Sequence, residues 1–242
     1  MDTPAANDAI GLDTPADPRF FTRLDRPVDF YLMRHGESEG NAAGRIQGRR
    51  DFPLSENGRA QARAAAAWLG SRGIGRVLAS PLARAYETAS IVAAELGLAA
   101  PLAEPLLMEL DTGVFSGLAM AEIRERYPED YARFKAESWA GVSGAESVAS
   151  LEARAIGAWR RMRDLAAAGE GQVLAVSHGG TMQWLVRACF GCRSWLPILP
   201  TGNCAVYRLS VEPAAGAGAP FVQWRELNER AAAALPSVAP LF

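Results

Sequence analysis

The sequence lacks the features that mark several large classes of protein. Its 242 residues include three cysteines, and Lys plus Arg (25) nearly balance Asp plus Glu (27). So few cysteines provide no disulfide framework and fit a reducing compartment. A chain without a strongly basic face is poorly suited to nucleic acids or anionic membranes. We therefore expect a small-molecule partner, no nucleic acid and no membrane, and we leave a homodimer open.

Targeting signals are also missing. The first residues, MDTPAANDAIGLDTPADP, have neither the positively charged start nor the apolar stretch of a secretory signal. No later apolar run approaches the length of a membrane span. These absences predict a cytoplasmic location.

The chain is rich in hydrophobic residues, which make up 49% of it and suffice for one large core. The Pro, Asp and Ala content of residues 1–27 supports no periodic pattern, so we expect a flexible N-terminal tail anchored near Phe20 and Phe21. We assign the folded domain to residues 28–228 and a C-terminal tail to 229–242.

Strand-like and helix-like patterns alternate from Val28 onward. Ser80 and Pro81 suit the N-cap and first position of a helix that Gly97 ends. This alternation predicts a three-layer α/β/α sandwich with a mainly parallel central sheet and an antiparallel edge. The expected strands are 28–34, 76–79, 105–109, 172–177, 205–210 and 221–227. The other expected helices are 56–69, two short ones within 119–137 separated by Pro128, 147–168 and 180–190.

The two histidines of the chain each follow an apolar run and precede glycine, in FYLMRHGES for His35 and VLAVSHGGT for His178. In an open α/β sheet, ligands collect beyond the carboxyl ends of the strands. We therefore expect both imidazoles at one rim. Arg84, one turn into its helix, and Glu109, at a further junction, are expected to join them there.

This group of side chains suits a phosphoryl ligand. Guanidinium groups match phosphate oxygens bidentately, and backbone N–H groups after each histidine add anion donors. Neutral imidazole is a competent nucleophile toward phosphorus, and Arg34 and Arg84 disfavour the imidazolium form of His35. Glu109 would donate the proton that a leaving alkoxide needs.

Together, the motifs of residues 28–210 resemble those of the histidine phosphatase superfamily, in its phosphoglycerate-mutase-like branch. The combination, order and spacing are specific, although a lone Arg-His-Gly would be weak. The pattern E-x-x-x-G-x-x-x-G singles out Glu109 from the nearby Glu104 and Asp111. The matching segments are LMRHGESEGN (32–41), RIQG (45–48), DFPLSENGRAQA (51–62), SPLARAYETA (80–89), MELDTGVFSG (108–117), SGAES (143–147) and VSHGG (176–180).

The resemblance implies roles for particular residues. His35 would accept the phosphoryl group and Glu109 would donate the proton. The phosphate would lie among Arg34, Asn41, Arg84 and His178, and weaker substrate contacts would come from Ser38, Gln47 and Gly179. One departure is Phe115-Ser116, where many relatives have an aromatic residue followed by Glu, and it affects the pocket wall.

Three other kinds of site compete with this interpretation. His35, Glu109 and His178 could form a 2-His-1-carboxylate metal site, although two arginines would then lie beside a cation. AVSHG (175–179) approximates the elbow of a serine hydrolase, but no histidine follows His178 in the chain. Cys189 and Cys192 form a C-x-x-C with no second pair, which favours a structural role.

The prediction is a metal-independent phosphomonoesterase that works through a phosphohistidine on a small phosphorylated metabolite, with no metal and no organic cofactor. Two alternatives remain, a phosphoglycerate mutase of the same family and a catalytically silent module that binds phosphorylated ligands. Mutases of the family resemble one another in a lysine after the glutamate segment and an adjacent arginine pair further on. This chain has Met120 in place of the lysine and no adjacent arginines between 118 and 147. The physiological substrate stays open.

Overall fold

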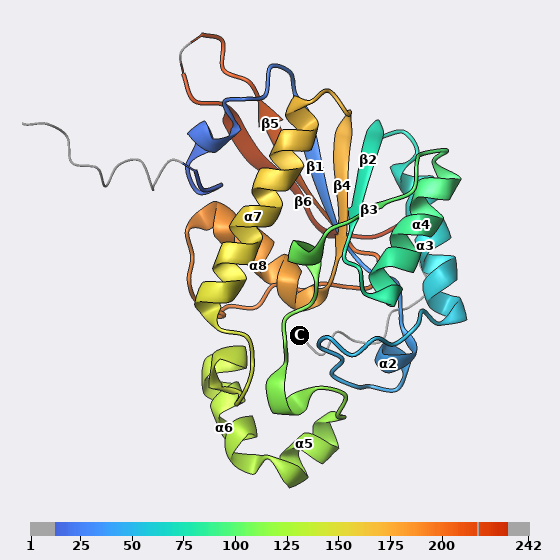
Figure 1. Ribbon diagram of the computed structural model, residues 1–242, viewed down its shortest axis with the longest axis vertical. Helices are drawn as coiled ribbons and strands as arrows, with labels where there is room; N and C mark the ends of the chain where they lie inside the picture. The colour runs from blue at the N-terminus through green and yellow to red at the C-terminus, as the bar shows by residue number, and fades with distance from the viewer. Residues whose placement is uncertain (1–12, 217, 232–242) are drawn as a thin grey trace, which may run out of the picture.

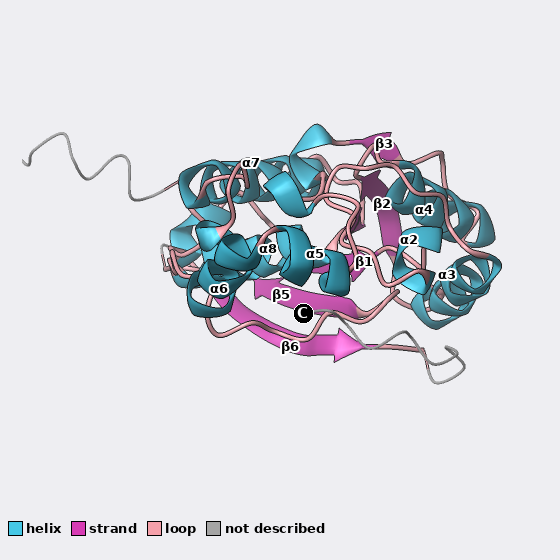
Figure 2. Cartoon of the chain, turned by 90° about the horizontal axis from the view of Figure 1, so that it is seen from below, coloured by secondary structure: helices cyan, strands magenta, loops and turns pink. Residues whose placement is uncertain are grey.

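The fold is a six-stranded sheet between two layers of helices, as Figures 1 and 2 show. The structure is a computed structural model that describes residues 13–216 and 218–231. The sheet order is β3-β2-β4-β1-β5-β6, and the pairs β3–β2, β2–β4 and β4–β1 are parallel. The pairs β1–β5 and β5–β6 are antiparallel. The expected α/β/α sandwich is therefore confirmed. The strands are β1 (Val28–Arg34), β2 (Ile74–Ala79), β3 (Leu102–Ala103), β4 (Gln172–Ser177), β5 (Val206–Glu212) and β6 (Phe221–Glu229).

Alternating residues of the central strands build two separate cores. Phe30 and Leu32 of β1 pack with the helices of one face, and Tyr31 and Met33 pack with those of the other. This is the period of two that a strand imposes on its side chains. Helices α7 (Val148–Ala167) and α8 (Gly179–Phe190) cover the first face, and α3 (Glu56–Leu69) and α4 (Ala83–Glu95) cover the second.

The strand ends that matter most lie side by side. In the register, Arg34 of β1 pairs with Ser177 of β4, and Ala79 of β2 pairs with Val176. The next residue of each strand, His35, His178 or Ser80, therefore emerges at the same edge of the sheet.

A short lobe closes this edge from below. It contains α5 (Met120–Arg126) and α6 (Pro128–Glu137), and it lies beneath the carboxyl ends of the strands in Figure 1. Phe115, Phe134 and Trp139 pack against one another with ring centroids 4.9 to 6.2 Å apart. This aromatic cluster is continuous with the core on the first face of the sheet and so packs the lobe onto the domain.

Two local predictions need correction. Residues 105–109 form no strand, because Pro105 offers no N–H to a ladder and Pro105–Leu107 make a 3₁₀ turn. Ser80 is not a helix N-cap, since α4 begins at Ala83 and the N–H of Ala83 donates to the Asp51 carboxylate at 2.7 Å.

The N-terminal segment is anchored in the core at Phe20 and Phe21, as the sequence predicted. A 3₁₀ turn at Pro18–Phe21 begins with Asp17, whose carboxylate accepts the N–H of Arg19, and both Phe20 and Phe21 are buried in the core. Buried aromatic area of this kind holds a segment that has no regular periodicity. Residues 1–12 and 232–242, which include most of the expected tails, lie outside the described residues.

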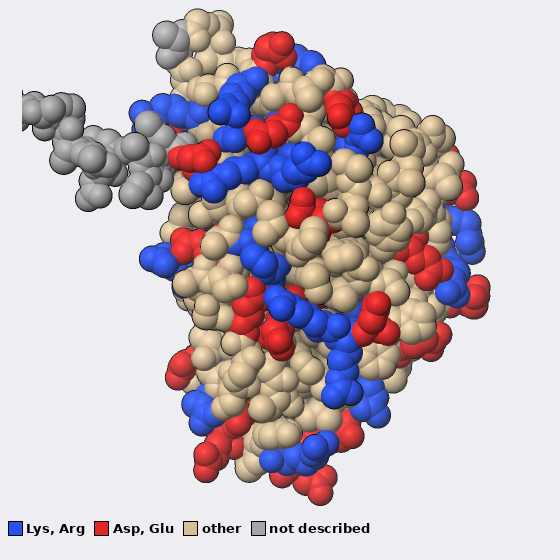
Figure 3. All heavy atoms as spheres, viewed as in Figure 1, with Lys and Arg blue, Asp and Glu red and all other residues tan. Residues whose placement is uncertain are grey.

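The surface carries charges of both signs. Arginine and acidic side chains are interspersed over the face that Figure 3 shows. Within residues 13–216 and 218–231, no helix combines the length and the apolar character that crossing a bilayer requires.

Candidate active site

His35 leaves the end of β1 with its ring fixed by two contacts. Its Nδ1 lies 2.6 Å from the carbonyl oxygen of Gly36, and its Nε2 lies 3.3 Å from Nε of Arg84. A carbonyl only accepts and a guanidinium only donates, so Nδ1 carries the hydrogen and Nε2 presents its lone pair. The nitrogen that remains unprotonated therefore faces the arginine.

The surroundings keep this imidazole neutral. His35 is almost completely buried, and burial, followed by the charges of Arg84 and Arg34, holds the pKa of its imidazole well below the ordinary value of 6.5. Burial and nearby cations both oppose the imidazolium form. His35 is thus a neutral base beside two cations.

Arg84 is held by the loop that precedes α3. Its Nη1 and Nη2 donate to the carbonyl oxygens of Arg50 and Gly48, each at 2.8 Å. Burial lowers the pKa of the Arg84 guanidinium to about 10, so the side chain is still cationic at neutral pH. Two carbonyls on one fork leave the guanidinium little freedom to move away from His35.

Arg34 adds a second buried cation near His35. Its Nη1 donates to the carbonyl of Thr201 at 2.5 Å, and its Nε has no hydrogen-bond partner in the described part of the chain. A buried donor without a partner in the protein is uncommon, and this one is suited to bind an anion.

His178 stands at the start of α8, with its ring centroid 5.0 Å from that of His35. Its Nε2 lies 2.8 Å from the hydroxyl of Ser80, and its Nδ1 is buried without a partner among residues 13–216 and 218–231. Burial and the charge of Arg84 hold the pKa of His178 well below its ordinary value. The topology therefore brings the two histidines together.

Glu109 reaches the same site from the segment after β3. Its carboxylate accepts the backbone N–H of Gly180 at 3.2 Å and of Thr181 at 3.0 Å, in the first turn of α8. Helix N-termini are suited to anions because their first N–H groups point outward. A Cβ at Gly180 would come within 2.0 Å of Leu110 and 2.8 Å of the Glu109 carboxylate. Glycine is therefore what allows the carboxylate to dock here.

The loop after His35 supplies an amide. The Oδ1 of Asn41 accepts from the N–H and the hydroxyl of Ser38 and from the Asn203 amide, which leaves the Asn41 amide hydrogens as its donors toward a ligand. Ser38 itself is fully buried as the N-cap of α2 (Glu39–Ala42), and its hydroxyl also contacts Gln47. Ser38 and Gln47 thus lie within the loop scaffold.

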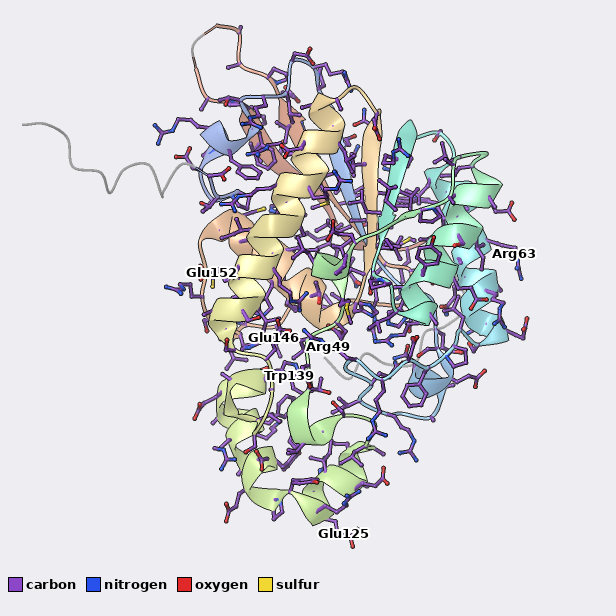
Figure 4. The ribbon with its side chains drawn as sticks, viewed as in Figure 1. Arg49, Arg63, Glu125, Trp139, Glu146 and Glu152 are labelled. Atoms are coloured by element: carbon purple, nitrogen blue, oxygen red, sulfur yellow. The ribbon has the colours of Figure 1, made fainter. Side chains whose placement is uncertain are left out.

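A charged network behind Glu109 was not predicted from the sequence. Arg154 forms a bidentate ion pair with Glu146 and donates to the carbonyls of Leu106 and Met108, which precede Glu109. Arg49 donates to the same Glu146 at 3.1 Å and to the carbonyl of Glu109 at 3.3 Å; Figure 4 shows Arg49 and Glu146 together above Trp139. The motif SGAES, which contains Glu146, was the one sequence feature that could have indicated this network.

Gly179 and Gly180 also border a narrow hollow at the start of α8. Its other walls are Trp139 from the α5–α6 lobe, Gln183, Trp195 and Ile198. The Gln183 side chain donates from Nε2 to the Leu199 carbonyl at 2.7 Å, and its Oε1 accepts the Leu199 N–H at 3.0 Å. These two hydrogen bonds fix the loop that carries Trp195 and Ile198 on α8.

The three alternative sites lack the arrangement of side chains that each would need. The hydroxyl of Ser177 is buried and donates to the Leu107 carbonyl at 2.8 Å, so it has no base beside it. Cys189 and Cys192 are free thiols. In the described residues, no three His, Cys, Asp or Glu side chains lie close enough together to hold a metal ion.

Known proteins resemble this chain over most of its length. It is 38% identical over 137 residues to phosphoserine phosphatase 1 of Hydrogenobacter thermophilus, which covers 56% of this chain and 64% of the relative. It is 37% identical over 196 residues to a probable phosphoglycerate mutase of Photorhabdus laumondii, covering 76% and 86%. The chain spans about half the length of the first curated relatives that it matches, among them a bifunctional protein of Mycobacterium tuberculosis.

A solved structure agrees with these sequences. A mycobacterial glucosyl-3-phosphoglycerate phosphatase, in complex with VO3, aligns with a TM-score of 0.68 and 28% identity over 84% of this chain and 98% of that one. The family model described as histidine phosphatase superfamily (branch 1) matches residues 30–219. This chain therefore belongs to branch 1 of the histidine phosphatase superfamily.

Proposed function

We propose that the protein is a phosphomonoesterase that transfers the phosphoryl group of a small metabolite to Nε2 of His35 and then to water. The observation that carries this proposal is the pair of contacts that sets the tautomer of His35. Its Nδ1–H is bound to the Gly36 carbonyl, so a lone pair on Nε2 is available beside Arg84. A neutral imidazole in a cationic pocket is suited to attack a phosphate dianion.

The first half of the reaction breaks the ester bond. The phosphate binds among Arg34, Arg84, Asn41 and His178, and Nε2 of His35 attacks phosphorus in line with the leaving oxygen. Glu109 protonates that oxygen as the P–O bond breaks.

Water completes the cycle. Glu109, now a carboxylate, accepts a proton from a water molecule that attacks the phosphohistidine, and inorganic phosphate leaves. Every charge on the transferred group is met by side chains of the chain itself, and no step calls for a metal or an organic cofactor. Relatives named as phosphatases, one for phosphoserine and one for glucosyl-3-phosphoglycerate, support hydrolysis of a small metabolite.

A trapping experiment tests the covalent step. Brief incubation with 4-nitrophenyl phosphate labelled with ³²P, followed by an alkaline quench, is expected to leave a base-stable, acid-labile label on the peptide that contains His35. The variant His35→Ala should carry no label and His178→Asn should carry less. Label on Ser177 or Cys192 would contradict the mechanism.

A further inference from the structure

Ser80 makes a contact that none of the proposed steps uses. It directly follows β2, and its backbone N–H donates to the Val176 carbonyl at 3.0 Å. Its hydroxyl lies 2.8 Å from Nε2 of His178, which directly follows the neighbouring strand β4. Both side chains are completely buried. The contact therefore belongs to the same strand ends that carry the site.

The hydrogens of this pair can be assigned by counting donors and acceptors. The N–H of Leu82 donates to the Ser80 hydroxyl oxygen at 3.3 Å, and in the described residues the hydroxyl hydrogen has one acceptor within reach, Nε2 of His178. If His178 donated instead, the serine hydrogen would be buried without an acceptor, which costs free energy.

The other ring nitrogen completes the assignment. A neutral imidazole has one hydrogen, and burial together with Arg84 keeps the pKa of His178 low enough for the ring to be neutral. With Nε2 accepting from Ser80, the hydrogen resides on Nδ1. That nitrogen is buried and unpartnered in the part of the chain that the structure describes, beside His35.

We propose that Ser80 is a positioning residue: its hydroxyl donates to Nε2 of His178 and so keeps the ring hydrogen on Nδ1, where it donates to a phosphoryl oxygen. In the other tautomer, Nδ1 would present a lone pair to an anion and repel it. The inference rests on the proposed function in one respect, namely that the ligand of the site is a phosphoryl group.

The chain allows a direct measurement because it has only two histidines. Protein labelled with ¹⁵N in its imidazole rings should give two sets of ring signals, which a His35→Gln variant assigns. Two-bond proton–nitrogen correlation spectra distinguish a nitrogen that bears hydrogen from one with a lone pair. In the wild type, His178 should carry its hydrogen on Nδ1, and vanadate should shift that signal.

Two serine variants separate positioning from packing. Ser80→Ala should lose the fixed tautomer of His178 and weaken inhibition by vanadate and by inorganic phosphate about tenfold, the worth of one hydrogen bond to a charged group. Ser80→Thr keeps a hydroxyl and should restore both. Ser177→Ala removes a buried serine hydroxyl that binds the Leu107 carbonyl, and it should leave the His178 tautomer unchanged.

The outcomes are separable from those of the proposed function. Hydrogen on Nε2 of His178 in the wild type would overturn the inference even if every variant failed to fold, and so would a Ser80→Ala protein with unchanged tautomer and vanadate affinity. If the wild type shows the expected tautomer and binds phosphate but hydrolyses no phosphomonoester, the role of Ser80 stands and the proposed function fails.

Discussion

Arg84 donates its Nε–H toward Nε2 of His35 across 3.3 Å, while the carbonyl of Gly36 accepts from the opposite nitrogen of the same ring. The arginine thus performs two tasks. Its Nε–H favours the tautomer in which Nε2 of His35 has the lone pair, and its positive charge lies where an incoming phosphate would bind. The pocket is therefore preorganised for an anion before any ligand arrives.

Replacing Glu109 by Gln should slow hydrolysis in a way that depends on the leaving group. General acid catalysis is worth about 10²- to 10⁴-fold, and a poor leaving group depends on it most. We expect kcat to fall strongly for glycerol phosphate and much less for 4-nitrophenyl phosphate. Glu104→Gln is the matched control, because Glu104 caps the turn at Pro105–Leu107 instead. Equal losses on both substrates would argue against proton donation by Glu109.

Replacing Gly180 by Ala should produce the same leaving-group pattern without touching an ionisable group. The new Cβ would collide with Leu110 and press on the Glu109 carboxylate, so the acid must move from the helix N-terminus. Gly70→Ala is the control, since Gly70 lies at a helix end and its Cβ would meet nothing closer than 3.4 Å. Steady-state kinetics on the two substrates decides the outcome, and an unaffected Gly180→Ala enzyme would refute the docking argument.

Stability should decline as the solution becomes acidic. Burial, Arg84 and Arg34 hold the pKa values of His35 and His178 well below 6.5 in the folded protein. Below about pH 6.5 the two histidines are protonated in the unfolded chain but stay neutral in the native protein. The free energy of unfolding therefore falls as the pH falls. Each histidine contributes up to about 1.4 kcal/mol per pH unit until its native pKa is reached.

Urea unfolding between about pH 7.5 and about pH 5 measures this effect. His35→Asn and His178→Asn should each flatten the dependence, because asparagine does not titrate. All other titratable groups are the same in the wild type and in each variant, so they serve as the internal control. A slope that neither variant reduces would show that other groups cause the acid sensitivity.

Hydrolysis should outrun phosphoryl transfer between positions of phosphoglycerate. A mutase must hold a bisphosphorylated intermediate, yet Met120 begins α5 where the resemblance places a lysine, and Arg49 beside Glu109 is already paired with Glu146. Supplying 3-phosphoglycerate with a trace of the 2,3-bisphosphate, we expect free phosphate to appear faster than 2-phosphoglycerate. Faster isomerisation would make the protein a mutase.

The sequence by itself determined the α/β/α architecture and the convergence of strand ends. The run before His35 and the run before His178 are apolar on both faces, which is typical of buried parallel strands, and parallel strands place their carboxyl ends at one edge. Most helices also follow from local signals, such as Ser55 at the start of α3 and Ser147 at the start of α7.

Only the tertiary structure decided the contacts between residues that are distant in sequence. Ser80 has the sequence signature of a helix cap, yet it contacts His178, 98 residues away. The sequence suggested Phe20 and Phe21 as an anchor, but only the tertiary structure shows the partners of Phe21, which are Trp159 and Phe30. Tautomers, docked carboxylates and buried turns depend on partners that are distant in sequence, and periodicity along the chain contains no information about such pairs.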